Sequence, residues 1–145
     1  MARPAEYENL LRIGAFKDAA SSPDSIAQFL NTAQEFSASA KMVQAQSVRF
    51  ALAYEGTFSV VMAVLEYYGV RPGDGGGHRT TAIARVAADL KLDAAKQSVL
   101  YRLHDARNRV TYRAPIPPIT AADAMAMQTI LDDVLAAAQN LIGLK

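Results

Sequence analysis

The run FSVVMAVL, Phe58 to Leu65, decides the fold. Seven of its eight residues are apolar and none is charged, so a helix through it has no strongly polar face. Helices that are apolar nearly all round are buried ones. The apolar pattern extends from Val43 to Tyr68, where Gly69 and then Pro72 provide the signals of a helix end. We therefore predict one long, central helix over 43–68.

Helical periodicity recurs on both sides of this segment. It predicts further helices over 5–20, 22–40, 78–90, 93–114 and 120–141. Ser22, Asp93 and Thr120 are suitable N-terminal caps, because a side-chain oxygen can accept a bond from an unpaired amide. Pro115 forces the penultimate helix to stop by Ala114. No stretch alternates long enough to predict a strand, so we expect an all-α fold: a five-helix bundle of up-and-down type, forming one domain over 1–145.

The composition excludes several classes of function. The 145-residue chain has a formal net charge of +1, so any binding of nucleic acid must come from a local patch. It has no cysteine, which excludes disulfides and a cysteine nucleophile, and its two histidines give no reason to expect a metal or a cofactor. The N-terminus lacks the features of a secretory signal, and the apolar run is shorter than the ~20 residues of a membrane span. We expect a cytoplasmic protein without a membrane segment.

A second stretch, LHDARNRVTYRAPIPP at 103–118, contains most of the candidate site residues. Spacings of four, three and four residues place one polar set on a single helix face: Tyr101, Asp105, Asn108 and Tyr112. His104 and Arg107 lie beside that face, one turn apart. Further positive charge comes from Arg102, Arg109 and Arg113. Because a guanidinium offers two parallel bonds to a phosphate, this patch predicts an anion site.

Three segments together resemble the HEPN superfamily, small helical proteins of toxin–antitoxin, defence and RNA-processing systems. They are AYEGTFSVVMAVLEYYGVRP, GGHRTTAIARVAADL and LHDARNRVTYRA, within residues 53–114. The hallmark of the family is an arginine, commonly followed by a polar residue, with a histidine five positions after the arginine. Those positions are Arg107, Asn108 and Tyr112 here. The resemblance implies a homodimer whose motif helices face each other across a cleft, and metal-independent cleavage of RNA.

The departure from the family lies at Tyr112. A phenol has a reference pKa of about 10 and is a poor general base near neutral pH, whereas an imidazole near 6.5 is well placed. Tyr112 can orient a phosphate or stack on a base, and His104 could supply the missing proton carrier from one turn earlier. Asp105 and Glu55 are candidate supporting acids. Glu55 either pairs with the motif arginine, if buried, or faces water.

Three functions remain open at this point. The first is a dimeric component of a toxin–antitoxin or defence module that binds RNA or cuts it, with activity weakened by Tyr112. The second is a non-catalytic partner of a nucleotidyltransferase antitoxin, in which the same cleft docks or positions a substrate. The third is a helical dimerisation scaffold whose polar stripe sets the register. A plainer interpretation of the arginines is that they complement the helix dipole and pair with acids.

Overall fold

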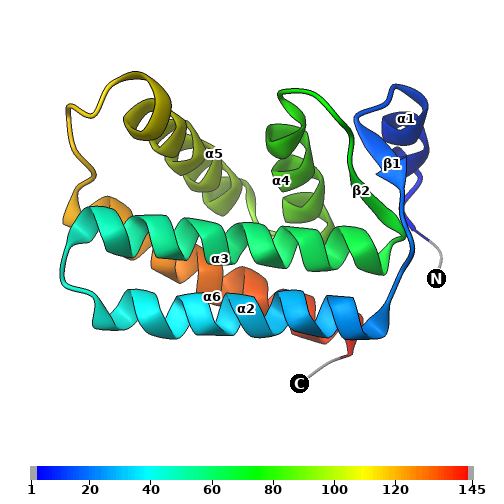
Figure 1. Cartoon of the computed structure of the whole chain (residues 1–145), viewed down its shortest axis with the longest axis horizontal. Helices are drawn as coiled ribbons and strands as arrows, with labels where there is room; N and C mark the ends of the chain where they lie inside the picture. Colours follow the sequence, from blue (N-terminus) through cyan, green and yellow to red (C-terminus); the bar gives the residue numbers. More distant parts are fainter. Residues whose placement is uncertain (1–2, 144–145) are drawn as a thin grey trace.

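The computed structural model describes residues 3–143, and the apolar run lies at the centre of the fold (Figure 1). It belongs to α3, Gln46–Tyr67, which packs against α2, Pro23–Met42, and α6, Ala121–Ile142. Val60 and Val64 on α3 are both fully buried. The predicted central helix is therefore confirmed, although it begins at Gln46 because Val43 has extended backbone.

Local signals place the helix starts correctly. The side-chain oxygen of Ser22 accepts the amide of Ser25 at 3.3 Å at the start of α2. Thr120 accepts the amide of Asp123 at 3.1 Å at the start of α6. Asp93 accepts a backbone amide in the same way at the start of α5, Ala94–Asn108. Each of these caps satisfies an amide that the first helical turn leaves without a partner.

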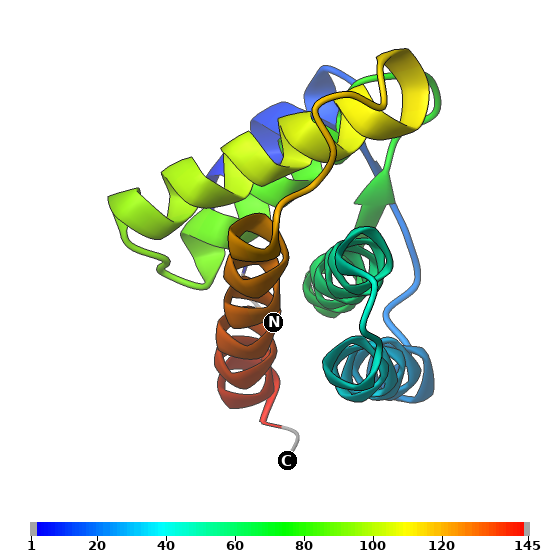
Figure 2. The same cartoon turned by 90° about the vertical axis from the view of Figure 1, so that its left-hand side faces the viewer.

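The helices do not form a simple up-and-down bundle. The α2 and α3 helices run antiparallel, but α4, His78–Asp89, and α5 cross α3 steeply on the side away from α2 (Figures 1 and 2). The α5 helix continues as one π-helical turn, η1, over Arg109–Arg113, and Ala114 then turns to extended backbone before Pro115. The two crossing helices form a junction with α3, where His104, Arg107 and Asn108 of α5 contact side chains of α3 and α4.

The N-terminal segment differs from the prediction. The first helix, α1, covers only Glu6–Arg12, because Gly14 adopts a left-handed backbone that ends it. Strand β1, Phe16–Asp18, then pairs antiparallel with β2, Val70–Pro72. In this ladder Lys17, the middle residue of β1, lies opposite Arg71. Residues 3–143 thus hold six helices, one for each predicted segment but one more than the expected five-helix bundle, together with a small two-stranded sheet that was not predicted. The fold is mostly helical.

The α3 helix is long and apolar enough to cross a membrane by length and composition alone. Within the fold, however, 56% of its most apolar window is buried against other parts of the chain. A core helix passes the same test of length and composition. The expectation that the protein has no membrane segment stays a prediction.

Candidate functional site

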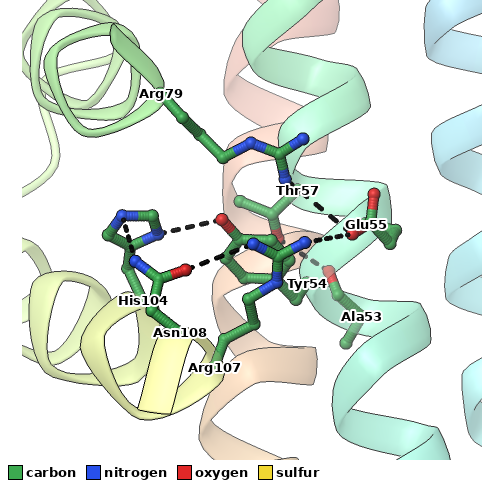
Figure 3. Close-up of polar contacts among 8 residues, drawn as sticks. All are labelled: Ala53, Tyr54, Glu55, Thr57, Arg79, His104, Arg107 and Asn108. Atoms are coloured by element: carbon green, nitrogen blue, oxygen red, sulfur yellow. Dashed lines mark hydrogen bonds and ion pairs between the residues drawn. The ribbon is translucent and has the colours of Figure 1, made fainter. Parts of the chain in front are cut away.

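The candidate site lies where α4 and α5 meet α3 (Figure 3). Each helix contributes polar side chains, and they form one connected group: Tyr54 and Glu55 from α3, Arg79 and Thr80 from α4, and His104, Arg107 and Asn108 from α5. The group sits at the edge of the core, because Tyr54 is 1% exposed whereas Glu55, the next residue, is half exposed. The structure thus places Glu55, His104, Arg107 and Asn108, all predicted site residues, side by side.

A chain of hydrogen bonds favours one set of proton positions in this group. Arg107 can only donate, so the Asn108 oxygen Oδ1, 3.2 Å from Arg107 Nη1, must be the acceptor. The Asn108 amide nitrogen then faces His104 Nε2 at 3.3 Å and requires that nitrogen to accept. His104 Nδ1 consequently carries the proton and donates to the Tyr54 hydroxyl at 2.9 Å. A neutral His104 with its proton on Nδ1 fits these contacts, because Nε2 can then accept from Asn108 or from the nearby Thr80 hydroxyl.

Electrostatics favour the same protonation state. Burial lowers the pKa of His104, and the charges of Arg107 and Arg79 lower it further against the opposing effect of Asp105. Burial also raises the pKa of the Tyr54 hydroxyl, although the two arginines oppose that change. Thr80 Oγ1 lies 3.0 Å from His104 Nε2, so this nitrogen has two neighbours. His104 is 4% exposed and both ring nitrogens are engaged, which suits it to hold Asn108 in place.

The Arg107 guanidinium is held in position mainly by aromatic rings. Its Cζ atom lies 4.7 Å from the centre of the Tyr54 ring and 5.3 Å from the centre of the Tyr112 ring. Its contact with the Glu55 carboxylate, Nη2 to Oε1, is long at 3.4 Å. The Arg107 side chain is 16% exposed. A cation over aromatic faces keeps its in-plane N–H donors free for other acceptors.

The π turn explains how Tyr112 reaches Arg107. Arg107 and Tyr112 are five positions apart. In a continuous α-helix the direction of the side chain rotates by about 500° over five positions, which would leave these two side chains about 140° apart around the helix axis. The turn at η1 winds more slowly, with the Ala114 amide bonded to the Arg109 carbonyl at 2.7 Å. Tyr112 thereby comes round to the Arg107 side of the helix and remains 70% exposed. Its ring forms the outer edge of the site.

Three residues of the group were not predicted as site residues: Tyr54, Arg79 and Thr80. Arg79 lies in the first turn of α4, and its guanidinium carbon is 3.9 Å from the centre of the Phe58 ring. The only signal in the sequence was that all three stand within the segments that resemble the HEPN superfamily. Their contribution depends on how α4 crosses α3, which no local pattern encodes.

The remaining predicted residues lie outside the connected group. Arg102 forms an ion pair with Asp123 of α6 at 3.0 Å, and Arg109 donates to the Ala114 carbonyl at 3.2 Å. Arg113 and Asp105 are exposed. Within residues 3–143, Asp105 makes no side-chain hydrogen bond or ion pair with the group. Of the predicted polar face, Tyr101 bonds to Gln97 at 3.1 Å and packs against the core.

Across the described part of the chain, no three histidine or acidic side chains gather in a way that could hold a metal ion. The donors at the junction are instead two guanidinium groups, an amide and a hydroxyl, which suit an anion. A scan of the chain against protein-family models and a search of the curated proteins gave no match.

Proposed function

We propose that the chain is a HEPN-like domain that binds RNA as a homodimer, with Arg107 on a backbone phosphate. The proposal rests on one observation: the Arg107 side chain is 16% exposed, and its guanidinium lies over the rings of Tyr54 and Tyr112. Besides its bond to Asn108 at 3.2 Å, this group has only a 3.4 Å contact to a carboxylate. A positioned guanidinium with free donors is well suited to a phosphodiester. The exposed ring of Tyr112 offers a stacking surface for a neighbouring base.

Exposed apolar side chains on η1, the loop that follows it and the start of α6 support the homodimer. Tyr112, Ile116 and Met125 are large apolar side chains that are 70%, 78% and 66% exposed. Exposed apolar groups of this kind are typical of the buried centre of an interface. A second copy on this surface would bring two Arg107 side chains to one groove. Ile116→Asp should then shift the mass measured by light scattering from dimer to monomer, whereas a parent protein that is monomeric at all concentrations would refute this part of the proposal.

Metal-independent cleavage by this site should be slow. Attack by a ribose 2′-hydroxyl on the adjacent phosphate requires a group that removes the hydroxyl proton. His104 is 4% exposed, and its Nε2 atom faces Asn108 and Thr80, so we assign it to positioning rather than to proton transfer. A phenol at the motif position is a weak base at neutral pH. Tyr112→His should therefore raise the cleavage rate in EDTA.

The test measures binding and cleavage of a labelled single-stranded RNA in EDTA, for the parent, Arg107→Ala and Arg107→Lys. Loss of a charged hydrogen-bonding group should weaken binding by about tenfold or more and reduce the salt dependence by about one phosphate contact. Lysine keeps the charge but not the planar fork, so it should restore binding only in part. Arg12→Ala is the matched control, because Arg12 is an exposed arginine of α1 that contacts Asn9. Equal losses in the Arg12 and Arg107 variants, or a parent that does not bind RNA, would refute the proposal.

A further inference from the structure

Two guanidinium groups in the site share one carboxylate. Arg79 Nη1 lies 3.8 Å from Glu55 Oε1, and Arg107 Nη2 lies 3.4 Å from the same oxygen (Figure 3). The three side chains therefore carry a net charge of +1 at the junction of α3, α4 and α5. A single carboxylate oxygen at these distances neutralises the two arginines incompletely.

Arg79 is the less satisfied of the two arginines. Its Nη1 atom is buried and has no hydrogen-bond partner among the described residues. Buried donors without an acceptor are rare in native proteins and call for an explanation. A ligand oxygen at this position would satisfy the donor. Nη1 faces the space that Glu55 partly fills, so an acceptor placed there would also be within reach of Arg107.

Aromatic rings, and not only Glu55, contact the two guanidinium groups. The Phe58 ring lies under Arg79, with its centre 3.9 Å from Cζ, and the Tyr54 ring lies 4.7 Å from the Cζ of Arg107. Glu55 itself is 42% exposed on the outer side of α3. Its carboxylate can therefore turn out into water while both guanidinium groups stay where they are. The cost is small, because partly exposed ion pairs contribute little to stability.

We infer that Arg79 and Arg107 together hold one phosphate group, and that Glu55 occupies their donors until the phosphate displaces it. A phosphodiester has two non-bridging oxygens and inorganic phosphate has four, so either can present a separate oxygen to each guanidinium group, whereas both arginines now share one oxygen of Glu55. The choice of an RNA phosphate as the natural ligand rests on the proposed function. The two-arginine site and its internal competitor rest on the geometry alone.

Substitution of Glu55 should strengthen phosphate binding, whereas substitution of an acid that only holds the arginines in place should weaken it. Glu55→Gln removes the competing charge and should tighten phosphate binding by about fivefold, the equivalent of a partly exposed ion pair. Asp105→Asn is the matched control, since it removes one negative charge nearby from a residue that contacts neither arginine. Its effect should stay below about twofold. Arg79→Ala should weaken binding about as much as Arg107→Ala.

The experiment titrates inorganic phosphate into full-length protein and follows the arginine Nε–Hε signals by NMR, and it repeats each titration with a labelled single-stranded RNA. We expect the Arg79 and Arg107 signals to move together with one dissociation constant, lower in Glu55→Gln than in the parent. Separate constants, or weaker or equal binding by Glu55→Gln relative to Asp105→Asn, would overturn the inference. If phosphate behaves as expected but RNA does not bind, the two-arginine site stands and the proposed RNA function fails. Circular dichroism of each variant confirms that it is folded.

Discussion

Gly56 offers a demanding test of the fold, because it lies on α3 where α2 and α6 both approach. A Cβ atom added at this position would lie 2.8 Å from Leu131 Cδ2 and 2.9 Å from Phe36 Cβ. Carbon atoms in contact are ordinarily about 3.5–4.0 Å apart. Gly56→Ala therefore introduces two overlaps, one with each neighbouring helix.

The two overlaps differ in how easily they relax. The end of the Leu131 side chain can change rotamer, but the Cβ atom of Phe36 moves only with the backbone of α2. An extra methyl group in a well-packed core costs about 1–3 kcal/mol. Alanine recovers about 1 kcal/mol relative to glycine inside a helix. Because relief of the Phe36 overlap requires the backbone of α2 to move, we take the upper part of the overpacking cost, about 2–3 kcal/mol. The expected net loss in the free energy of unfolding is then about 1–2 kcal/mol.

Urea denaturation of Gly56→Ala, followed by circular dichroism, measures this loss. Gly76→Ala is the control, because a Cβ at Gly76 meets no atom within 4 Å and its backbone is not in the left-handed region. The control should stay within about 0.5 kcal/mol of the parent. If Gly56→Ala is as stable as the parent or more so, the close approach of α2 and α6 to α3 is wrong.

Two further predictions concern titration and buried charge. Because the pKa of His104 is lowered in the folded state, its contribution to stability is complete above the unfolded value of about 6.5 and is lost as the pH falls below that, by about 1.4 kcal/mol for each pH unit in which only the unfolded state binds the proton. His104→Gln should show a shallower decline in unfolding free energy between pH 7.5 and 5.5, and parallel curves would contradict the neutral, buried imidazole. Asp89, whose side chain is 1% exposed, pairs with Arg85 at 2.8 Å and accepts from the Tyr7 hydroxyl at 2.5 Å. Asp89→Asn should therefore lower the free energy of unfolding by about 3 kcal/mol, and Tyr7→Phe by only about 1–2 kcal/mol. If thermal denaturation shows the larger loss for Tyr7→Phe, the interpretation of Asp89 as a buried carboxylate paired with Arg85 is refuted.

The parts of the fold that could be predicted are those with local causes. A cap such as Ser22 acts within one turn, and the apolar surface of α3 is visible in its own residues. The sheet could not be predicted, because each strand has three residues and its partner lies far along the chain. A strand of that length shows no alternating pattern. The left-handed backbone at Gly14 likewise ends α1 earlier than the periodicity suggests.

The same distinction between local and tertiary causes applies to the candidate site. Arg107, Asn108 and His104 stand on one helix, so their spacing predicted that they lie together, as the structure shows. Arg79 comes from another helix, and its place depends on a crossing angle that only tertiary packing sets. The approach of Tyr112 to Arg107 depends on the π turn, which simple helical periodicity does not anticipate. The roles of these residues toward RNA stay predictions.

The apolar character of α3 has a consequence for synthesis of the chain. The ribosome makes α3 before α4, α5 and α6, and α6 supplies much of the surface that covers it. At about 5–20 residues per second, the nascent chain carries for several seconds a long apolar helix that α2 covers on one side only. Chaperones that bind hydrophobic segments, and the machinery that delivers such segments to membranes, would both encounter α3 in that interval. Efficient production of this protein therefore depends on how soon α6 emerges from the exit tunnel.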